Sequence, residues 1–103
     1  MSVPPKKHSK TEALKIIRRI RRDGVVVPTN HLKVRMRERG FEMRDVIEAI
    51  NKGAIYDEAE MHPKTGRWNY TVRGKTVDGE SLDLVIDLDE DNERVVILTG
   101  MTR

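Results

Sequence analysis

The fold is decided by the stretch Leu82-Asp83-Leu84-Val85-Ile86-Asp87-Leu88. Apolar residues stand at every second position, which is the period of a β-strand with one buried face. After the acidic turn Asp89–Glu93, the segment Arg94–Met101 is largely apolar and predicts a second strand. Two such strands joined by a short turn form an antiparallel hairpin.

The period of two continues upstream of this hairpin. Arg67–Arg73 predicts a strand whose aromatic residues share one side, and Ala54–Glu60 predicts the strand before it. Short polar or glycine-containing turns separate these segments, and consecutive strands joined in this way are antiparallel. The second half of the chain therefore predicts an antiparallel meander.

Three segments before the strands have the apolar spacing of amphipathic helices, and a glycine follows each one. The predicted helices are Ser9–Asp23, His31–Arg39 and Met43–Lys52, followed by Gly24, Gly40 and Gly53. Val25–Pro28 is extended and ends at a proline, so it is either a linker or a short strand. This order predicts an α+β fold, with N-terminal helices packed on one face of a small antiparallel sheet.

Length and composition bound the classes of protein that remain. With 103 residues, the chain is expected to form one α+β domain over residues 9–103, preceded by a disordered basic tail at residues 1–8. The absence of cysteine excludes disulfides, thiol catalysis and cysteine-ligated metal sites. No apolar run approaches the roughly 18–20 residues that span a bilayer, and the N-terminus lacks the apolar segment of a secretory signal. We therefore expect a cytoplasmic protein without a membrane partner.

The net charge of +3 conceals an asymmetry between the two halves of the chain. Residues 1–52 carry 14 Lys and Arg against 6 Asp and Glu, whereas residues 53–103 carry 6 against 11. This division indicates either a surface that binds polyanions or electrostatic pairing between the halves. Two ordinary solvated faces are an equally simple explanation.

His31, Arg35 and Arg39 form the first candidate site. On a helix they step by four residues, so their side chains lie roughly one above another at the border of the buried stripe. A partly desolvated histidine beside two guanidinium groups can bind a phosphate and transfer a proton near neutral pH. The structural alternative is that His31 packs or caps the helix start while both arginines form ion pairs, and on residue types alone this is the more common case.

A second candidate surface follows the strand Arg67–Arg73. Charge for a bound phosphodiester could come from Lys64, Arg67, Arg73 and Lys75. Trp68 and Tyr70 could stack on the bases of single-stranded nucleic acid. More often, however, a Trp and a Tyr on one face of a strand belong to the core.

The acidic turn is a candidate metal site. Asp87-Leu88-Asp89-Glu90-Asp91 begins like a calcium loop, but Asn92 and Leu98 occupy the positions where the EF-hand pattern needs glycine and glutamate. A solvated hairpin turn explains these residues better. We therefore expect neither a metal site nor a cofactor.

Four motifs occur in an order that has a counterpart among known domains. They are His31-x-x-x-Arg35-Met36-x-Glu38-Arg39-Gly40-Phe41, Asp45-Val46-x-x-Ala49-Ile50-x-x-Gly53, Gly79-x-x-Leu82 and Val95-Val96-Ile97-Leu98-Thr99. In these motifs the chain resembles an uncharacterised bacterial domain family, which looks like a distant relative of the RelE/ParE-type toxins, near MqsR and BrnT. The resemblance covers about residues 29–102 and leaves out the first predicted helix. Family members often have an aromatic residue after the last threonine, where this chain has Gly100-Met101.

The resemblance implies a RelE-like fold and the toxin of a type II toxin–antitoxin system, a metal-independent endoribonuclease that acts on mRNA. In that chemistry a base activates the ribose 2′-OH, cations stabilise the charged phosphorane and an acid protonates the leaving oxygen. His31 is implied as the acid or base, Arg35 and Arg39 (and secondarily Arg73) as the stabilising cations, and Tyr70 as a secondary stacking residue. The implied partners are RNA, including ribosome-bound mRNA, and a cognate antitoxin protein, often one with a zinc-binding domain.

Two other classes of function stay open. A catalytically silent nucleic-acid-binding module would need only phosphate contacts, and a partner-docking module would use the first helix. The same fold can serve all three functions. Substitution of His31 separates an enzyme from a binder, and salt dependence separates a nucleic-acid binder from a protein-docking module.

Overall fold

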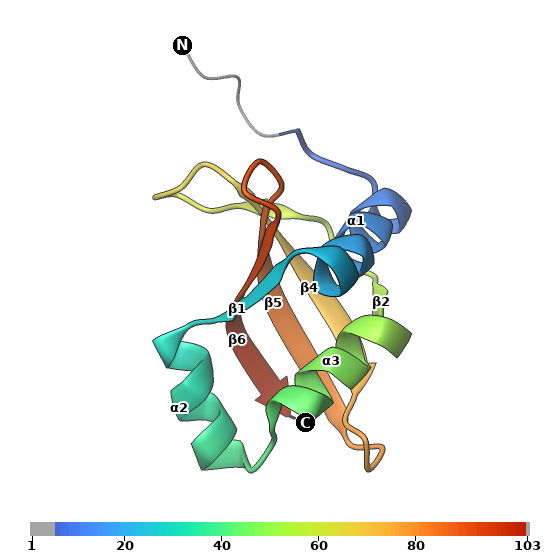
Figure 1. The fold of residues 1–103 in the computed structure, drawn as a ribbon, viewed down its shortest axis with the longest axis vertical. Helices are drawn as coiled ribbons and strands as arrows, with labels where there is room; N and C mark the ends of the chain where they lie inside the picture. The colour runs from blue at the N-terminus through green and yellow to red at the C-terminus, as the bar shows by residue number, and fades with distance from the viewer. Residues whose placement is uncertain (1–5, 103) are drawn as a thin grey trace.

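The computed structural model describes residues 6–102 and confirms the α+β class. The helices are α1 (Lys10–Asp23), α2 (Asn30–Arg39) and α3 (Met43–Lys52). The strands are β1 (Val25–Pro28), β2 (Ala54–Ile55), β3 (Glu60–Met61), β4 (Trp68–Lys75), β5 (Ser81–Asp89) and β6 (Arg94–Thr102). The helices lie on one face of the sheet, and the opposite face of β4, β5 and β6 carries no helix (Figure 1).

The sheet is mixed, which corrects the expectation of a purely antiparallel one. Its order is β1-β6-β5-β4-β2, with β3 also pairing with β4. Strands β4, β5 and β6 form the predicted meander, but β1 runs parallel to β6, from the pair Val25–Arg94 to the pair Pro28–Ile97. Val25–Pro28 is therefore a strand and not a linker. Its partner strand, β6, lies at the other end of the chain, so no local sequence pattern could predict the pairing.

The predicted strand Ala54–Glu60 is in fact two short strands. Ile55 pairs with Val72 and Glu60 pairs with Asn69, so residues 56–59 lie opposite only two residues of β4. The surplus edge residues cannot continue the ladder and bulge away from it. Two acidic side chains of this bulge form ion pairs with residues outside it, Asp57 with Arg73 and Glu58 with Lys7.

The core lies between the helices and the sheet and is mostly aliphatic. Fully buried side chains include Ile17 and Ile20 of α1, Val46 and Ile50 of α3, and Val72, Leu84, Ile86 and Ile97 of the sheet. Helix α3 packs directly on the backbone of β4, because a Cβ added at Gly74 would lie 2.7 Å from Ala49 Cα. Only glycine permits this approach.

Caps place the helices within one residue of the predicted boundaries. The Ser9 hydroxyl accepts a hydrogen bond from Glu12 N–H at 3.1 Å, as the capping box predicts for α1. The buried carboxylate of Asp45 in α3 accepts hydrogen bonds from the N–H groups of Glu42 and Val77, both at 2.9 Å. The start of α3 is thereby tied to the β4–β5 turn.

The segment before α1 lies against the end of the sheet. The N–H of His8 donates to the Tyr70 hydroxyl at 3.0 Å, and Lys7 Nζ lies 3.1 Å from a Glu58 carboxylate oxygen. These residues belong to the tail expected to be disordered, of which residues 1–5 lie outside the described part. Within residues 6–102, no helix combines the length and the apolar character that a membrane span requires.

Candidate nucleic-acid interface

Helix α2 is held on β6 by its N-cap residue, Thr29. The Thr29 hydroxyl accepts from Leu32 N–H at 3.2 Å and lies 2.9 and 3.1 Å from the carbonyl oxygens of Ile97 and Leu98, to which it can donate. Leu98 is the extra residue of a β-bulge, since Val85 pairs with Thr99 while Ile86 pairs with Ile97. The Ile97 carbonyl also accepts a hydrogen bond from Thr29 N–H at 3.3 Å, so two adjacent carbonyl groups of β6 anchor the helix that carries the candidate residues.

The structure places His31, Arg35 and Arg39 on successive turns of α2, as predicted. His31 and Arg39 are exposed and Arg35 is half-buried. Arg35 Nη1 lies 3.9 Å from Glu38 Oε1, an exposed pair of little energetic value. Neither His31 nor Arg39 forms a side-chain hydrogen bond or ion pair with any other residue in the range 6–102. The alternative in which ion pairs consume both arginines therefore fails for Arg39 and is weak for Arg35.

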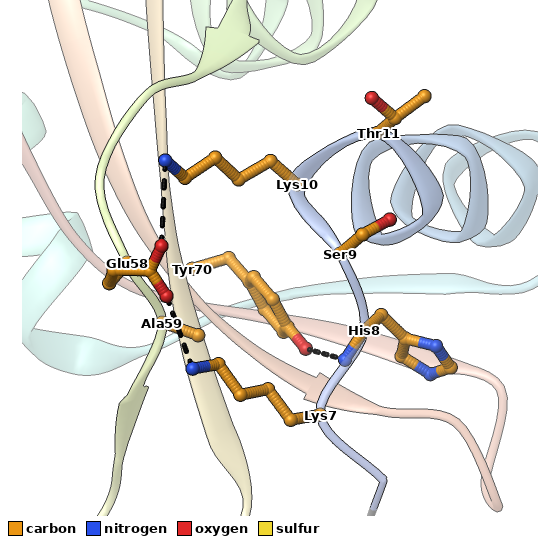
Figure 2. Close-up of a pocket in the computed structure, with 8 residues that line it drawn as sticks. All are labelled: Lys7, His8, Ser9, Lys10, Thr11, Glu58, Ala59 and Tyr70. Atoms are coloured by element: carbon orange, nitrogen blue, oxygen red, sulfur yellow. Dashed lines mark hydrogen bonds and ion pairs between the residues drawn. The ribbon is translucent and has the colours of Figure 1, made fainter.

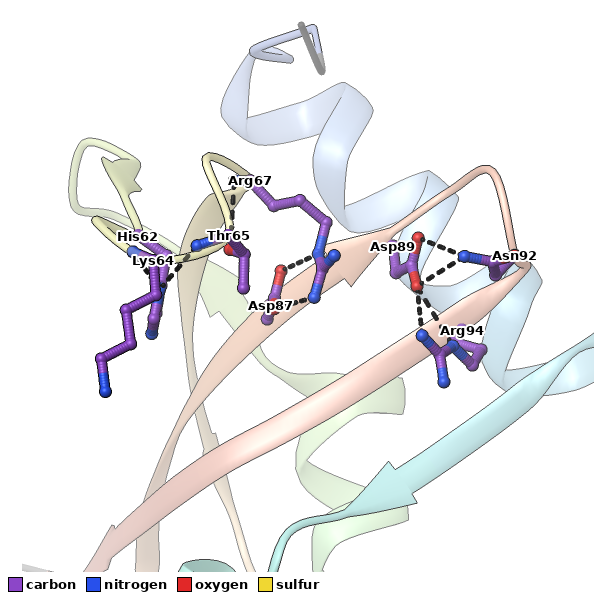
Figure 3. Close-up of polar contacts among 8 residues, drawn as sticks. All are labelled: His62, Lys64, Thr65, Arg67, Asp87, Asp89, Asn92 and Arg94. Atoms are coloured by element: carbon purple, nitrogen blue, oxygen red, sulfur yellow. Dashed lines mark hydrogen bonds and ion pairs between the residues drawn. The ribbon is translucent and has the colours of Figure 1, made fainter. Parts of the chain in front are cut away.

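The Arg67 side chain forms an ion pair with a buried carboxylate of β5. Its guanidinium forms two parallel hydrogen bonds with the Asp87 carboxylate, at 2.9 and 2.8 Å (Figure 3). Asp87 is only 2% exposed, so this pair neutralises a carboxylate that burial would otherwise destabilise. The hydrogen bonds also raise the pKa of Arg67. Nε and Nη2 of Arg67 are therefore engaged by Asp87, and a phosphate at this position has to compete with that carboxylate for them.

The other predicted cations of this surface are dispersed along β4. Lys64 is exposed in the β3–β4 turn, and Lys75 is exposed at the far end of β4. Because a strand rises about 3.3 Å per residue, the two ends of this strand lie roughly 23 Å apart. Arg73 lies between these two ends, and its Nη2 is 3.1 Å from an oxygen of Asp57. Both side chains of this ion pair are partly exposed. The structure therefore does not gather all of these residues into one site: Arg73 and Lys75 line one groove, and Lys64 lies toward the opposite end of β4.

Tyr70 belongs to the core, which is the alternative that residue statistics favoured. It is 2% exposed, and its hydroxyl accepts the hydrogen bond from His8 N–H (Figure 2). Burial raises the pKa of the Tyr70 hydroxyl. The imidazole of His8 in turn pairs with the Glu90 carboxylate. With its ring buried and its hydroxyl bonded, Tyr70 offers no face on which a base could stack.

The exposed aromatic side chain is Tyr56, which sequence reasoning missed. It is 64% exposed and lines an open groove of about 560 Å³ together with Arg73 and Lys75. The available signal was alternation in the expected strand Ala54–Glu60, which puts Tyr56 on the face opposite Ile55. In the structure Tyr56 lies beyond the end of β2, in the bulge of residues 56–59, and is exposed there.

The acidic turn is a hairpin, as expected. The Asp89 carboxylate accepts hydrogen bonds from Asn92 at 3.1 Å and from Arg94 at 2.7 Å (Figure 3). Burial alone would raise the pKa of Asp89, but these hydrogen bonds hold it below its ordinary value. No group of three or more His, Asp or Glu side chains in residues 6–102 is arranged to hold a metal ion.

Comparison with known proteins gives one match. Residues 29–99 match the sequence family described as "Domain of unknown function (DUF4258)". The matched segment begins at the N-cap of α2 and ends in β6, so it contains the row His31–Arg35–Arg39 and leaves α1 outside, as the motifs indicated. No curated protein and no solved structure matches the chain.

Proposed function

The chain belongs to the DUF4258 family, whose function is unknown, and we propose that it is the toxin of a type II toxin–antitoxin system, a metal-independent endoribonuclease acting on mRNA. The observation that supports this proposal is the cationic row of α2, residues His31, Arg35 and Arg39. His31 and Arg39 are exposed and Arg35 is half-buried, Thr29 anchors the helix to β6, and the sheet carboxylates do not neutralise the row. The family motif and its resemblance to RelE/ParE-type toxins supply the reaction class.

In the proposed reaction, the RNA supplies the nucleophile. The ribose 2′-oxygen attacks the adjacent phosphorus and the bond to the 5′-oxygen breaks, which leaves a 2′,3′-cyclic phosphate and a 5′-hydroxyl. His31 exchanges a proton with the attacking or the leaving oxygen. Arg35 and Arg39 stabilise the charge that accumulates on the phosphorane, where fixed donors have their largest effect.

A second candidate function is a non-catalytic nucleic-acid-binding or partner-docking module. It is favoured by one observation: no side chain or carbonyl in the described part of the chain forms a hydrogen bond with the His31 imidazole. Catalytic histidines are usually oriented by such a partner, whereas phosphate binding requires only accessible positive charge.

The RNA-binding step is tested by fluorescence anisotropy with a labelled single-stranded RNA. We compare Arg35→Ala/Arg39→Ala with Lys15→Ala/Arg22→Ala, a pair of exposed cations on α1 that removes the same charge. If each arginine contacts one phosphate, the first variant lowers the slope of log affinity against log salt by about 1.4, since each contact in single strands contributes about 0.7. Equal losses in the two variants would show only general electrostatic attraction and would contradict the proposed interface.

A further inference from the structure

A groove between α2 and α3 has no role in the proposed RNA chemistry. It is an open depression of about 660 Å³ where α2 ends and α3 begins, and its walls include Lys33, Met36, Arg37, Phe41 and Met43. This volume lies within the range of roughly 300–1,000 Å³ found for ligand pockets. It is on the flank of α2 opposite His31 and Arg35, because Lys33 and Arg37 follow His31 by about 200° and 240° of helical rotation.

The floor of the groove is apolar and adaptable. Met36 and Met43 are partly buried against the core, and Phe41 is 3% exposed. The ring of Phe41 is fixed, because it fills the space beside Gly100, where an added Cβ would lie 2.8 Å from Phe41 Cζ. Methionine side chains, in contrast, adjust easily to different apolar partners.

One rim of the groove carries uncompensated positive charge. Lys33 and Arg37 are exposed, stand one turn apart, and form no side-chain hydrogen bond or ion pair with other described residues. Glu42 also lines the groove, but its carboxylate lies 3.0 Å from Arg44 Nε. A ligand that fits this surface combines apolar groups with negative charge.

We propose that the groove binds an acidic amphipathic peptide segment of a partner protein. Its apolar side chains contact Met36 and Met43, and its carboxylates pair with Lys33 and Arg37. A nucleotide fits less well, because the buried Phe41 ring offers no stacking face and the N–H groups of Gly40 and Phe41 are both bonded to the Met36 carbonyl. The proposal is independent of RNA cleavage, because it uses neither His31 nor Arg35 and Arg39.

The methionine methyl groups provide a direct test by NMR. The probe is a synthetic helical peptide with the repeating sequence Glu-Leu-Leu-Glu, titrated into the full chain labelled with ¹³C at its methionine methyls. The Met36 and Met43 signals are expected to shift and saturate, while those of Met61 and Met101, which are 50% and 46% exposed at other places, stay unchanged. A peptide with lysine in place of glutamate should not bind.

Matched charge reversals locate the contact. Lys33→Glu/Arg37→Glu is expected to weaken peptide binding by about tenfold or more, whereas Arg35→Glu/Arg39→Glu, on the other flank of the same helix, has a smaller effect. Both pairs include exposed side chains, and thermal melts establish that the variants are folded. The proposal is overturned if the Met61 and Met101 signals shift together with those of Met36 and Met43, if the lysine peptide binds equally well, or if the two reversals weaken binding equally. It is also overturned if the labelled RNA, and not the peptide, shifts Met36 and Met43.

Discussion

Two arginines illustrate how the surroundings of a side chain decide its role. Arg19 forms two hydrogen bonds with Glu93, at 2.7 and 3.0 Å, and Arg67 forms two with Asp87, at 2.9 and 2.8 Å. The geometry is alike, but the Asp87 side chain is 3% exposed and the Glu93 side chain 52% exposed. Water can replace the partner of Glu93 and cannot easily replace that of Asp87.

Arg67→Ala is therefore expected to lower the free energy of unfolding by roughly 1–3 kcal/mol, because it leaves a buried carboxylate without its partner. Arg19→Ala is expected to cost much less than Arg67→Ala, because water can replace the partner of an exposed ion pair. Urea denaturation at neutral pH measures both values, and the double variant Arg67→Ala/Asp87→Ala should recover part of the loss. Equal losses in the two single variants would contradict this assignment.

The aromatic residues of β4 show what residue patterns can and cannot decide. Alternation along β4 correctly placed Trp68 and Tyr70 on the face opposite Asn69 and Thr71. It could not reveal that helices cover this face, because which face is covered depends on the whole fold. A local pattern thus assigns a side chain to a face, but tertiary structure decides whether that face is accessible.

At the scale of elements, one carboxylate joins the start of α3 to the β4–β5 turn. Burial alone would raise the pKa of Asp45, but the N–H groups of Glu42 and Val77 hold it below its ordinary value. A carboxyl group with a lowered pKa stabilises the fold above its unfolded pKa of about 3.9, and the contribution is lost as the pH falls through the folded value.

Asp45→Asn is expected to lower stability by roughly 1–3 kcal/mol at pH 7, because the amide cannot accept both hydrogen bonds. The difference from the wild type should shrink as the pH is lowered from about 5 toward 2, where the wild-type carboxylate becomes protonated. Urea denaturation across this pH range measures the difference in the free energy of unfolding. Asp78→Asn, an exposed aspartate of the β4–β5 turn, is the control. A difference that is constant with pH would contradict the role of the charged form.

The elements themselves were predictable where local signals define them. Caps and glycines predicted the three helices, alternation predicted β4 and β5, and the largely apolar run Arg94–Met101 predicted β6. These signals failed at the two edges of the sheet. Strand β1 pairs with β6, which is distant in sequence. Residues 56–59 leave the ladder because four residues of this segment lie opposite only two residues of β4. Pairing between distant segments is not encoded in any short window.

At the scale of the whole molecule, the charge asymmetry has two different outcomes. Ion pairs between the basic and acidic halves come from the N-terminal segment and α1: Lys7 and Lys10 pair with Glu58, His8 with Glu90 and Arg19 with Glu93. The cations of α2 form no such pair within the described residues, and Arg35 contacts only Glu38 of its own helix. In α1, Lys15, Arg18 and Arg21 likewise form no ion pair within the described residues, so both basic helices retain positive charge that can attract a polyanion.

The most direct test of the account is tightly induced expression of the wild type and of His31→Ala in a bacterial host. Growth and the 5′ ends of total RNA are compared at matched levels of soluble protein. The account predicts that the wild type arrests growth and creates new RNA 5′ ends, and that His31→Ala does neither while retaining most RNA binding. Normal growth with intact RNA, or arrest and cleavage that persist in His31→Ala, would contradict the proposal that α2 carries a ribonuclease site.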